Sequence, residues 1–172
     1  MENEKRLHRC CFTGHRPEKM TGIERIKVKS LLKAEIKKAI QDGYVTFISG
    51  MARGIDMWAA EIVLAEKKKN PDIHLICASP HEGFERRWDE TEKQRYRDIL
   101  SQADIVKYIC EHASRSCYQI RNEWMVDHSS RVIAAYNGSA GGTLNTINYA
   151  KKNDVEVINI LKRKKNLFRQ IT

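Results

Sequence analysis

Short apolar runs alternate with longer segments of helical periodicity along this chain. The apolar runs predict strands over residues 9–13, 46–49, 73–79, 104–109, 131–136 and 156–161. Between them, helices are expected over residues 21–41, 56–69, 84–101 (in two pieces), 118–128 and 143–153. Strands that alternate with helices of this length favour an α/β fold with a doubly wound, mostly parallel sheet of about six strands and helices on both faces.

The boundary signals support this interpretation. Thr21 followed three residues later by Glu24 has the pattern of a capping box, and Asp42-Gly43 ends the helix that it opens. No repeat or linker interrupts the alternation. We therefore expect one domain over residues 1–172, with its core over about 9–161 and a short basic C-terminal tail.

The composition is that of a cytoplasmic globular protein. Hydrophobic residues make up 41% of the 172 residues and charged residues 31%. No apolar stretch approaches the roughly 20 residues that span a bilayer, and the N-terminus is too polar for a signal peptide. We therefore expect no membrane partner.

Thirty-one Lys and Arg exceed 22 Asp and Glu, for a net charge of +9. The excess lies mainly on the helix over residues 21–41 and after residue 161. Such charge suits an anionic ligand or nucleic acid, but it is also usual on solvated helix faces, so nucleic acid is possible without being favoured.

The five cysteines have no metal-ligand spacing, and we expect no metal site. Cys10, Cys11, Cys77 and Cys110 fall in apolar, strand-like runs, which predicts reduced and mostly buried thiols. Cys117 lies beside Arg115 near a helix start and is a candidate reactive thiol.

Three predicted strands end in turns rich in glycine and small polar residues. The carboxyl ends of parallel strands share one edge of a sheet, where ligands bind. Backbone N–H groups and the dipole of a following helix favour phosphate at such a turn. Three turns of this kind indicate a nucleotide-like ligand, and the proposed contacts are Gly14, His15, Arg16, Ser49, Gly50, Met51, Ala52, Arg53, Asn137, Gly138, Gly141, Gly142 and Thr143.

The turn over residues 137–143 is the predicted phosphate cradle. The backbone N–H groups of Gly141, Gly142 and Thr143 are its expected donors. No lysine follows the glycines and the spacing is not G-x-G-x-x-G, so it is neither a P-loop nor a dinucleotide fingerprint.

The turn over residues 49–54 is expected to form the facing wall, with Trp58 packed beneath it. Asp56 either caps the next helix or contacts the ligand. In the first turn, His15 offers a titratable group and Arg16 a bidentate donor.

Arg121 is the catalytic candidate. It shares a helix face with Met125. The spacing leaves two placements open: Arg121 reaches the pocket, or it pairs at the surface with Glu123 or Asp127.

The motifs together resemble a known family. They are Phe12-Thr13-Gly14-His15-Arg16-Pro17, the segment over residues 49–60, Asn122-Glu123-Trp124-Met125-Val126-Asp127, and Gly141-Gly142-Thr143. They are similar to the YpsA-like proteins of the SLOG superfamily, which also holds the DNA-processing protein DprA and the LOG phosphoribohydrolases. The resemblance implies a Rossmann-like fold and a nucleotide site, and some bacterial members are linked with control of cell division.

Comparison with LOG enzymes tests the hydrolase function. Arg121 and Met125 match their Arg-Lys-x-x-Met helix, and Gly142-Thr143 matches their Gly-Thr turn. The position of their glutamate holds Thr146, which cannot handle a proton in the same way. Asp127 or Glu82 could supply a carboxylate instead, although the spacing selects neither.

We therefore expect a cytoplasmic sensor or regulator that binds a nucleotide-derived small molecule, with no resident cofactor and with homo-oligomers possible. The alternatives are hydrolysis of the N-glycosidic bond of a nucleoside monophosphate and binding of single-stranded nucleic acid.

Overall fold

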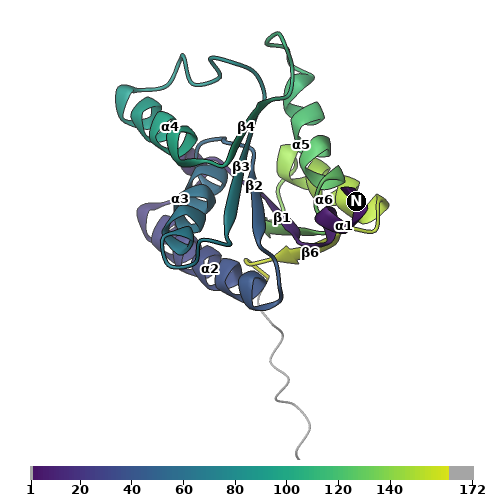
Figure 1. The fold of residues 1–172 in the computed structure, drawn as a ribbon. Coiled ribbons are helices and arrows are strands. Elements are labelled where there is room, and N and C mark those ends of the chain that lie inside the picture. Colours follow the sequence, from purple (N-terminus) through teal and green to yellow (C-terminus); the bar gives the residue numbers. More distant parts are fainter. Residues whose placement is uncertain (1, 163–172) are drawn as a thin grey trace, which may run out of the picture.

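The computed structural model describes residues 2–162, with side chains from residue 4 onward, and contains one six-stranded parallel sheet (Figure 1). The strands are β1 (Arg9–Gly14), β2 (Thr46–Ser49), β3 (His74–Ser79), β4 (Ile105–Tyr108), β5 (Arg131–Ala135) and β6 (Glu156–Asn159). Their order is β4-β3-β2-β1-β5-β6, and every described pair is parallel. This confirms the predicted Rossmann-like α/β fold.

Helices cover both faces of the sheet (Figure 1). They are α1 (Glu2–Leu7), α2 (Gly22–Gln41), α3 (Ile55–Lys67), α4 (Glu90–Gln102), α5 (Cys117–Asp127) and α6 (Gly142–Lys152), with a 3-10 turn over Pro17–Lys19. Helices α2, α3 and α4 lie on one face, while α5 and α6 lie on the other. The strands β1, β2, β3 and β5 are thus largely buried between two helical layers, as their apolar sequences predict, whereas the edge strand β4 is exposed.

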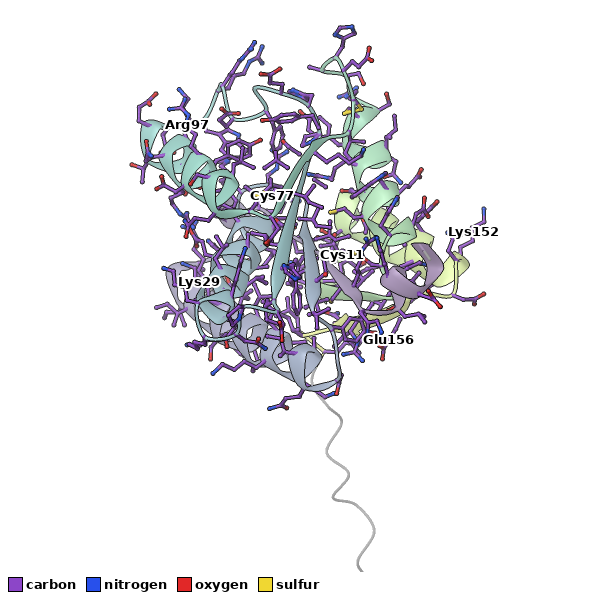
Figure 2. All side chains as sticks on the ribbon, in the orientation of Figure 1. Cys11, Lys29, Cys77, Arg97, Lys152 and Glu156 are labelled. Carbon is purple, nitrogen blue, oxygen red and sulfur yellow. A yellow bond between two sulfur atoms is a disulfide. The ribbon has the colours of Figure 1, made fainter. Side chains whose placement is uncertain are left out.

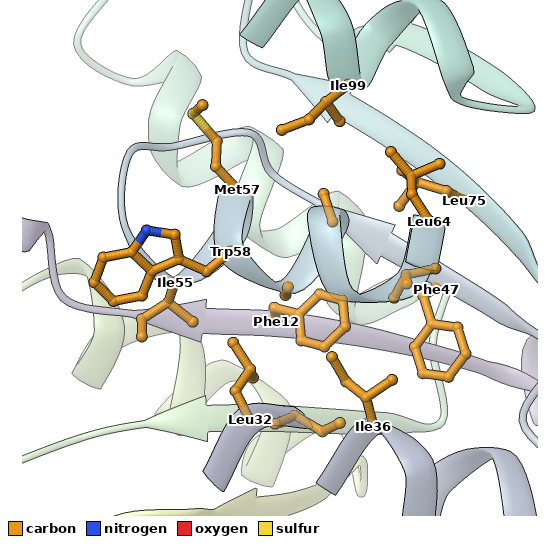
Figure 3. Close-up of a cluster of buried hydrophobic side chains, with 14 of the residues drawn as sticks. Phe12, Leu32, Ile36, Phe47, Ile55, Met57, Trp58, Leu64, Leu75 and Ile99 are labelled. Atoms are coloured by element: carbon orange, nitrogen blue, oxygen red, sulfur yellow. The ribbon is translucent and has the colours of Figure 1, made fainter. Parts of the chain in front are cut away.

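The larger core cluster lies between the sheet and α2, α3 and α4. In Figure 3, Phe12 and Phe47 from neighbouring strands face Leu32 and Ile36 of α2. The two phenyl rings stack with centroids 6.0 Å apart. Trp58 is also part of this core, with 4% of its surface exposed.

Charged side chains lie mainly on the outside, whereas Cys11 and Cys77 lie within the sheet (Figure 2). The capping box is confirmed: the Thr21 N–H donates to Glu24 Oε2 at 2.7 Å and the Glu24 N–H to Thr21 Oγ1 at 3.2 Å. No helix between residues 2 and 162 combines the length and apolar content needed to cross a bilayer.

The segment over residues 84–89 differs from the prediction because it forms turns rather than helix. Phe84 packs edge-on against Trp88, with ring centroids 5.1 Å apart, and also contacts the ring of Tyr118. Helix α4 begins only after Asp89, whose carboxylate accepts the Glu92 N–H at 3.0 Å. Tertiary packing of aromatic rings therefore overrides the local helical pattern. The structure also adds α1, which was not predicted.

Two of the five cysteines correct the sequence prediction. Cys110 and Cys117 form a disulfide with their Cα atoms 6.1 Å apart, so neither is a free thiol and Cys117 is not a reactive one. Cys110 follows β4 in a loop rather than lying in a strand. Cys10, Cys11 and Cys77 are free and buried as expected. Burial raises the pKa of both Cys11 and Cys77 to about 12. The predicted basic tail begins after residue 161, and its residues 163–172 lie outside the described residues.

Candidate functional site

A cavity opens where the chain changes direction in the sheet. From β1 the chain proceeds outward through β2, β3 and β4, and then returns to place β5 on the other side of β1. The turns that follow β1 and β5 therefore lead to helices on opposite faces of the sheet, and open α/β sheets bind ligands in the crevice between such turns. We call the space here, of about 370 Å³, the switch-point cavity. Its lining comprises Phe12, Thr13, Gly14, His15, Arg16, Lys19, Ala52, Asp56, Tyr118, Arg121, Asn122, Ala140, Gly141, Gly142 and Thr143.

The first turn of α6 forms one wall of this cavity. Gly141 precedes the helix with a φ of 138°, and no side chain caps the helix there. The N–H groups of a first helical turn have no partner inside the helix. Added bulk at Gly142 would meet only Asn122 Nδ2, at 4.0 Å, so the turn is open toward the cavity.

Other parts of this turn are structural. Asn137 Oδ1 accepts the Ser139 N–H at 3.1 Å, and neither Asn137 nor Gly138 lines the switch-point cavity. Thr146 is fully buried, and its hydroxyl donates to the Gly142 carbonyl at 2.9 Å. Thr146 therefore braces α6 and presents no group to the cavity.

The turn after β1 brings Gly14, His15 and Arg16 to the opposite wall. His15 is buried, and its Nε2 accepts the Asn137 N–H at 3.5 Å. Burial, together with the charge of Lys19, lowers the pKa of His15, so its imidazole is neutral at pH 7. Arg16 is exposed at the rim, and Lys19 adds a second cation to this wall.

In the turn after β2, some residues are buried behind the cavity wall and others line a cavity. The Ser49 hydroxyl donates to the Asp56 carbonyl at 2.8 Å and accepts the Met51 N–H at 3.2 Å. Ser49 and Met51 are fully buried behind the wall, and Met51 has a φ of 62°. Ala52 lines the cavity, while Arg53 points into a neighbouring one.

A buried charged pair forms the floor of the switch-point cavity. Arg121 and Asp56 are 5% and 6% exposed. They flank Gly50, where a Cβ would lie 2.8 Å from both Arg121 Nη1 and Asp56 Oδ2. Arg121 Nη1 donates to the Gly50 carbonyl, and Asp56 Oδ2 accepts the Ala52 N–H at 3.3 Å. Only glycine fits between the two groups.

The pair is electrostatically perturbed. Burial raises the pKa of Asp56 to about 6, although the Arg121 charge opposes this shift. Burial also lowers the pKa of Arg121. Perturbed ionisable groups that face a cleft are typical of functional sites. The sequence left Asp56 as a cap or a contact, and the structure places its carboxylate on the cavity floor.

The placement that the sequence left open for Arg121 is thereby resolved. Arg121 enters the cavity and does not pair with Glu123, which accepts from Gln119 Nε2 at 2.8 Å. Asp127 is exposed and accepts the Tyr149 hydroxyl at 3.0 Å, away from the site. Sequence analysis missed Lys19, Tyr118 and Asn122, whose spacing carries no signal of a shared cavity.

A second cavity of about 540 Å³ adjoins the first at the carboxyl ends of β3 and β4. We call it the arginine cavity. Its lining comprises Arg16, Ala52, Arg53, His81, Glu82, Gly83, Phe84, Arg86, Arg87, Trp88, Ala113, Ser114, Arg115 and Tyr118. Four of these, Phe84, Arg86, Arg87 and Trp88, were missed because the segment over residues 84–88 was predicted to be helical.

No group of three or more His, Cys, Asp and Glu side chains in residues 4–162 could hold a metal ion. The linings of the two cavities supply backbone donors, cations, aromatic rings, the imidazoles of His15 and His81, and the carboxylates of Asp56 and Glu82.

Comparisons with known proteins agree with this architecture. The sequence model of the YspA SLOG family matches residues 10–162. The SPbeta prophage-derived protein YoqJ of Bacillus subtilis, which is described as uncharacterized, is 36% identical over 140 residues that cover 74% of this chain and 82% of YoqJ.

Two solved structures share the fold. DNA processing protein A from Helicobacter pylori, solved to describe its single-stranded DNA binding mode, has a TM-score of 0.63 and 17% identity, covering 95% of this chain and 69% of that one. DprA from Streptococcus pneumoniae has a TM-score of 0.63 and 18% identity, covering 88% of this chain and 49% of that one. This chain therefore spans about half of the pneumococcal protein.

Proposed function

The chain belongs to the YspA SLOG family, and from this premise we propose that it binds a nucleotide or nucleotide-derived ligand in the switch-point cavity. The observation that carries the proposal is the uncapped first turn of α6, which opens into a cavity between the ends of β1 and β5. A helix N-terminus at a topological switch point favours a phosphate group.

The walls of the cavity suit the rest of such a ligand. Arg16 and Lys19 add positive charge on the wall opposite the open turn, and Arg121 lies on the floor. The Asp56 carboxylate, when ionised, can accept hydrogen bonds from sugar hydroxyls. A volume of about 370 Å³ falls within the range of small-molecule sites.

We further propose that the protein acts as a cytoplasmic sensor or regulator rather than as a hydrolase. Thr146 occupies the place of the LOG glutamate and is turned into the protein, where it bonds Gly142. A ligand that binds without turnover can report its own concentration.

Hydrolysis of an N-glycosidic bond remains a second candidate because of Asp56. Its raised pKa, about 6, lies near the pH at which a carboxyl group can exchange protons efficiently. Arg121 beside it could orient the substrate. The predicted alternatives Asp127 and Glu82 lie outside the switch-point cavity.

Single-stranded nucleic acid is a third candidate, favoured by the arginine cavity. Cationic grooves with aromatic side chains bind single strands through phosphate contacts and base stacking. Here, five arginines lie with Phe84, Trp88 and Tyr118.

Calorimetry with the four nucleoside monophosphates and their parent nucleosides tests the main proposal. We expect at least one monophosphate to bind, and its nucleoside to bind at least tenfold more weakly, because a charged hydrogen bond contributes about 1.5–3 kcal/mol. Equal affinity for nucleoside and monophosphate would contradict a phosphate at α6.

The same mixtures decide between binding and hydrolysis. Chromatographic release of free base from a monophosphate, lost in both Asp56→Asn and Arg121→Ala, would establish the hydrolase. Binding without release supports the sensor. A panel of oligonucleotides at two salt concentrations tests the third candidate, since phosphate contacts weaken as salt rises.

A further inference from the structure

The arginine cavity holds more positive charge than a mononucleotide in the switch-point cavity would use. Its cations are Arg16, Arg53, Arg86, Arg87 and Arg115, and the acidic residue in its lining is Glu82. Within residues 4–162, only Arg53 of these five makes an ion pair, with Glu18 at 2.5 Å. Four guanidinium groups are thus available to an anion.

Aromatic rings form a continuous cluster in the same cavity. The Phe84 ring lies 5.1 Å from that of Trp88 and 5.8 Å from that of Tyr118, centroid to centroid. The Arg53 guanidinium lies over the Trp88 ring at 5.9 Å. Tyr118 is 37% exposed, so its ring can receive a base. Stacking on such rings is available to every nucleobase.

The two cavities adjoin each other. Arg16, Ala52 and Tyr118 line both of them. A ligand anchored at the first turn of α6 that extends past Tyr118 would therefore reach the arginine cavity. The combined site has an anion-binding turn at one end, an aromatic side chain at the junction, and a cationic, aromatic chamber at the other end.

We propose that the site takes a dinucleotide-type ligand, in which one phosphate rests on the α6 turn and a second phosphate with its nucleoside occupies the arginine cavity. This rests on the proposed nucleotide function. The first nucleoside lies against Tyr118 at the junction. The second phosphate meets Arg86, Arg87 and Arg115, and the second base stacks on the Phe84–Trp88 cluster.

The glycine next to the arginines contributes to the shape of this chamber. Gly83 has a φ of 72°, and a Cβ there would collide with Arg86. Arg86 is therefore folded across Gly83, in the turn that also presents Arg87. This turn, which forms where a helix was predicted, directs Arg86 and Arg87 toward the cavity.

Calorimetry with adenosine 5′-monophosphate and the 5′-phosphorylated dinucleotide pApA tests the inference. We expect pApA to bind at least about tenfold more tightly, the lower limit for one added charged hydrogen bond. The Arg86→Ala/Arg87→Ala variant should lose this gain and keep its affinity for the monophosphate. Both side chains are exposed, so the variant should fold.

Lys151→Ala/Lys152→Ala is the matched control. These lysines are adjacent and exposed at the far end of α6, and their loss removes the same charge. The control should retain the gain for pApA. If it loses as much as the arginine variant, the effect is long-range charge and the inference fails.

The remaining outcomes distinguish failure of this inference from failure of the proposed function. Monophosphate binding with no gain for pApA overturns this inference and leaves the proposed function intact. Failure of pApA and of all four nucleoside monophosphates to bind overturns the proposed function. A steep further gain from pApA to a hexanucleotide would also overturn the inference, because the occupant would then be a longer single strand.

Discussion

Gly142→Asp tests the phosphate assignment most directly. Gly142 is the first residue of α6 and lines the switch-point cavity. Its φ is not positive, and the nearest atom to an added Cβ is Asn122 Nδ2 at 4.0 Å. An aspartate is therefore sterically allowed and places a negative charge where the phosphate should lie.

The expected loss follows from electrostatics. At an effective dielectric constant of about 20, two unit charges roughly 5 Å apart repel by about 3 kcal/mol. This corresponds to a dissociation constant that is roughly 100-fold larger. The fold should survive, because an acidic residue in the first turn of a helix interacts favourably with the helix dipole.

Gly22→Asp supplies the control. Gly22 is likewise the first residue of its helix, α2, is exposed, and has no heavy atom within 4 Å of an added Cβ. Calorimetry should show wild-type affinity for Gly22→Asp and a roughly 100-fold loss for Gly142→Asp. Both should unfold in urea within about 0.5 kcal/mol of the wild type. Unchanged affinity in Gly142→Asp would refute the assignment of phosphate to this turn.

Three further outcomes are expected. Gly50→Ala should abolish nucleotide binding and lower the free energy of unfolding by about 1–3 kcal/mol, because the added Cβ would lie 2.8 Å from both Arg121 Nη1 and Asp56 Oδ2. The Gly142→Ala variant should bind nucleotide normally. Equal effects of the two substitutions would contradict this steric reasoning. The pKa of Asp56 is raised from 3.8 to about 6, so the wild type should lose about 2 kcal/mol of stability relative to Asp56→Asn as the pH rises from 4 to 7; parallel stability curves would disprove the shift. Cys110→Ser removes a disulfide that joins residues seven positions apart. It should lower the free energy of unfolding by about 2.5 kcal/mol in oxidising buffer but not in dithiothreitol. An equal loss in both buffers would mean that the bond does not form.

The Asp56 carboxylate on the floor of the switch-point cavity compensates in part for the missing LOG glutamate. Thr146 removes a carboxylate from the α6 side of the site, and its hydroxyl bonds Gly142 instead. Asp56 supplies a carboxylate from α3 on the other side, next to Arg121. The cavity is therefore not without an acid, although the position of that acid differs from the LOG pattern. Base release from a nucleotide, measured in Asp56→Asn, decides whether this group does chemistry or only binds.

Local patterns determined most of the fold. Alternating apolar runs and amphipathic helices place β2 at residues 46–49 as predicted, and the Thr21–Glu24 capping box begins α2 as expected. These features depend on neighbours in the sequence, through strand burial and through hydrogen bonds within one helical turn. The glycine turns were visible for the same reason. Three strands that end in small residues predict one binding edge in any parallel sheet.

Contacts between distant segments were decided only by the tertiary structure. Asp56 and Arg121 lie 65 positions apart in the sequence, and they become neighbours because both approach Gly50. The same holds for Phe84 and Tyr118, whose packing keeps the segment over residues 84–89 out of a helix. Sequence alone thus predicted the sheet edge at which the candidate site lies. Which side chains form its floor and second chamber depended on long-range packing, which no local spacing records.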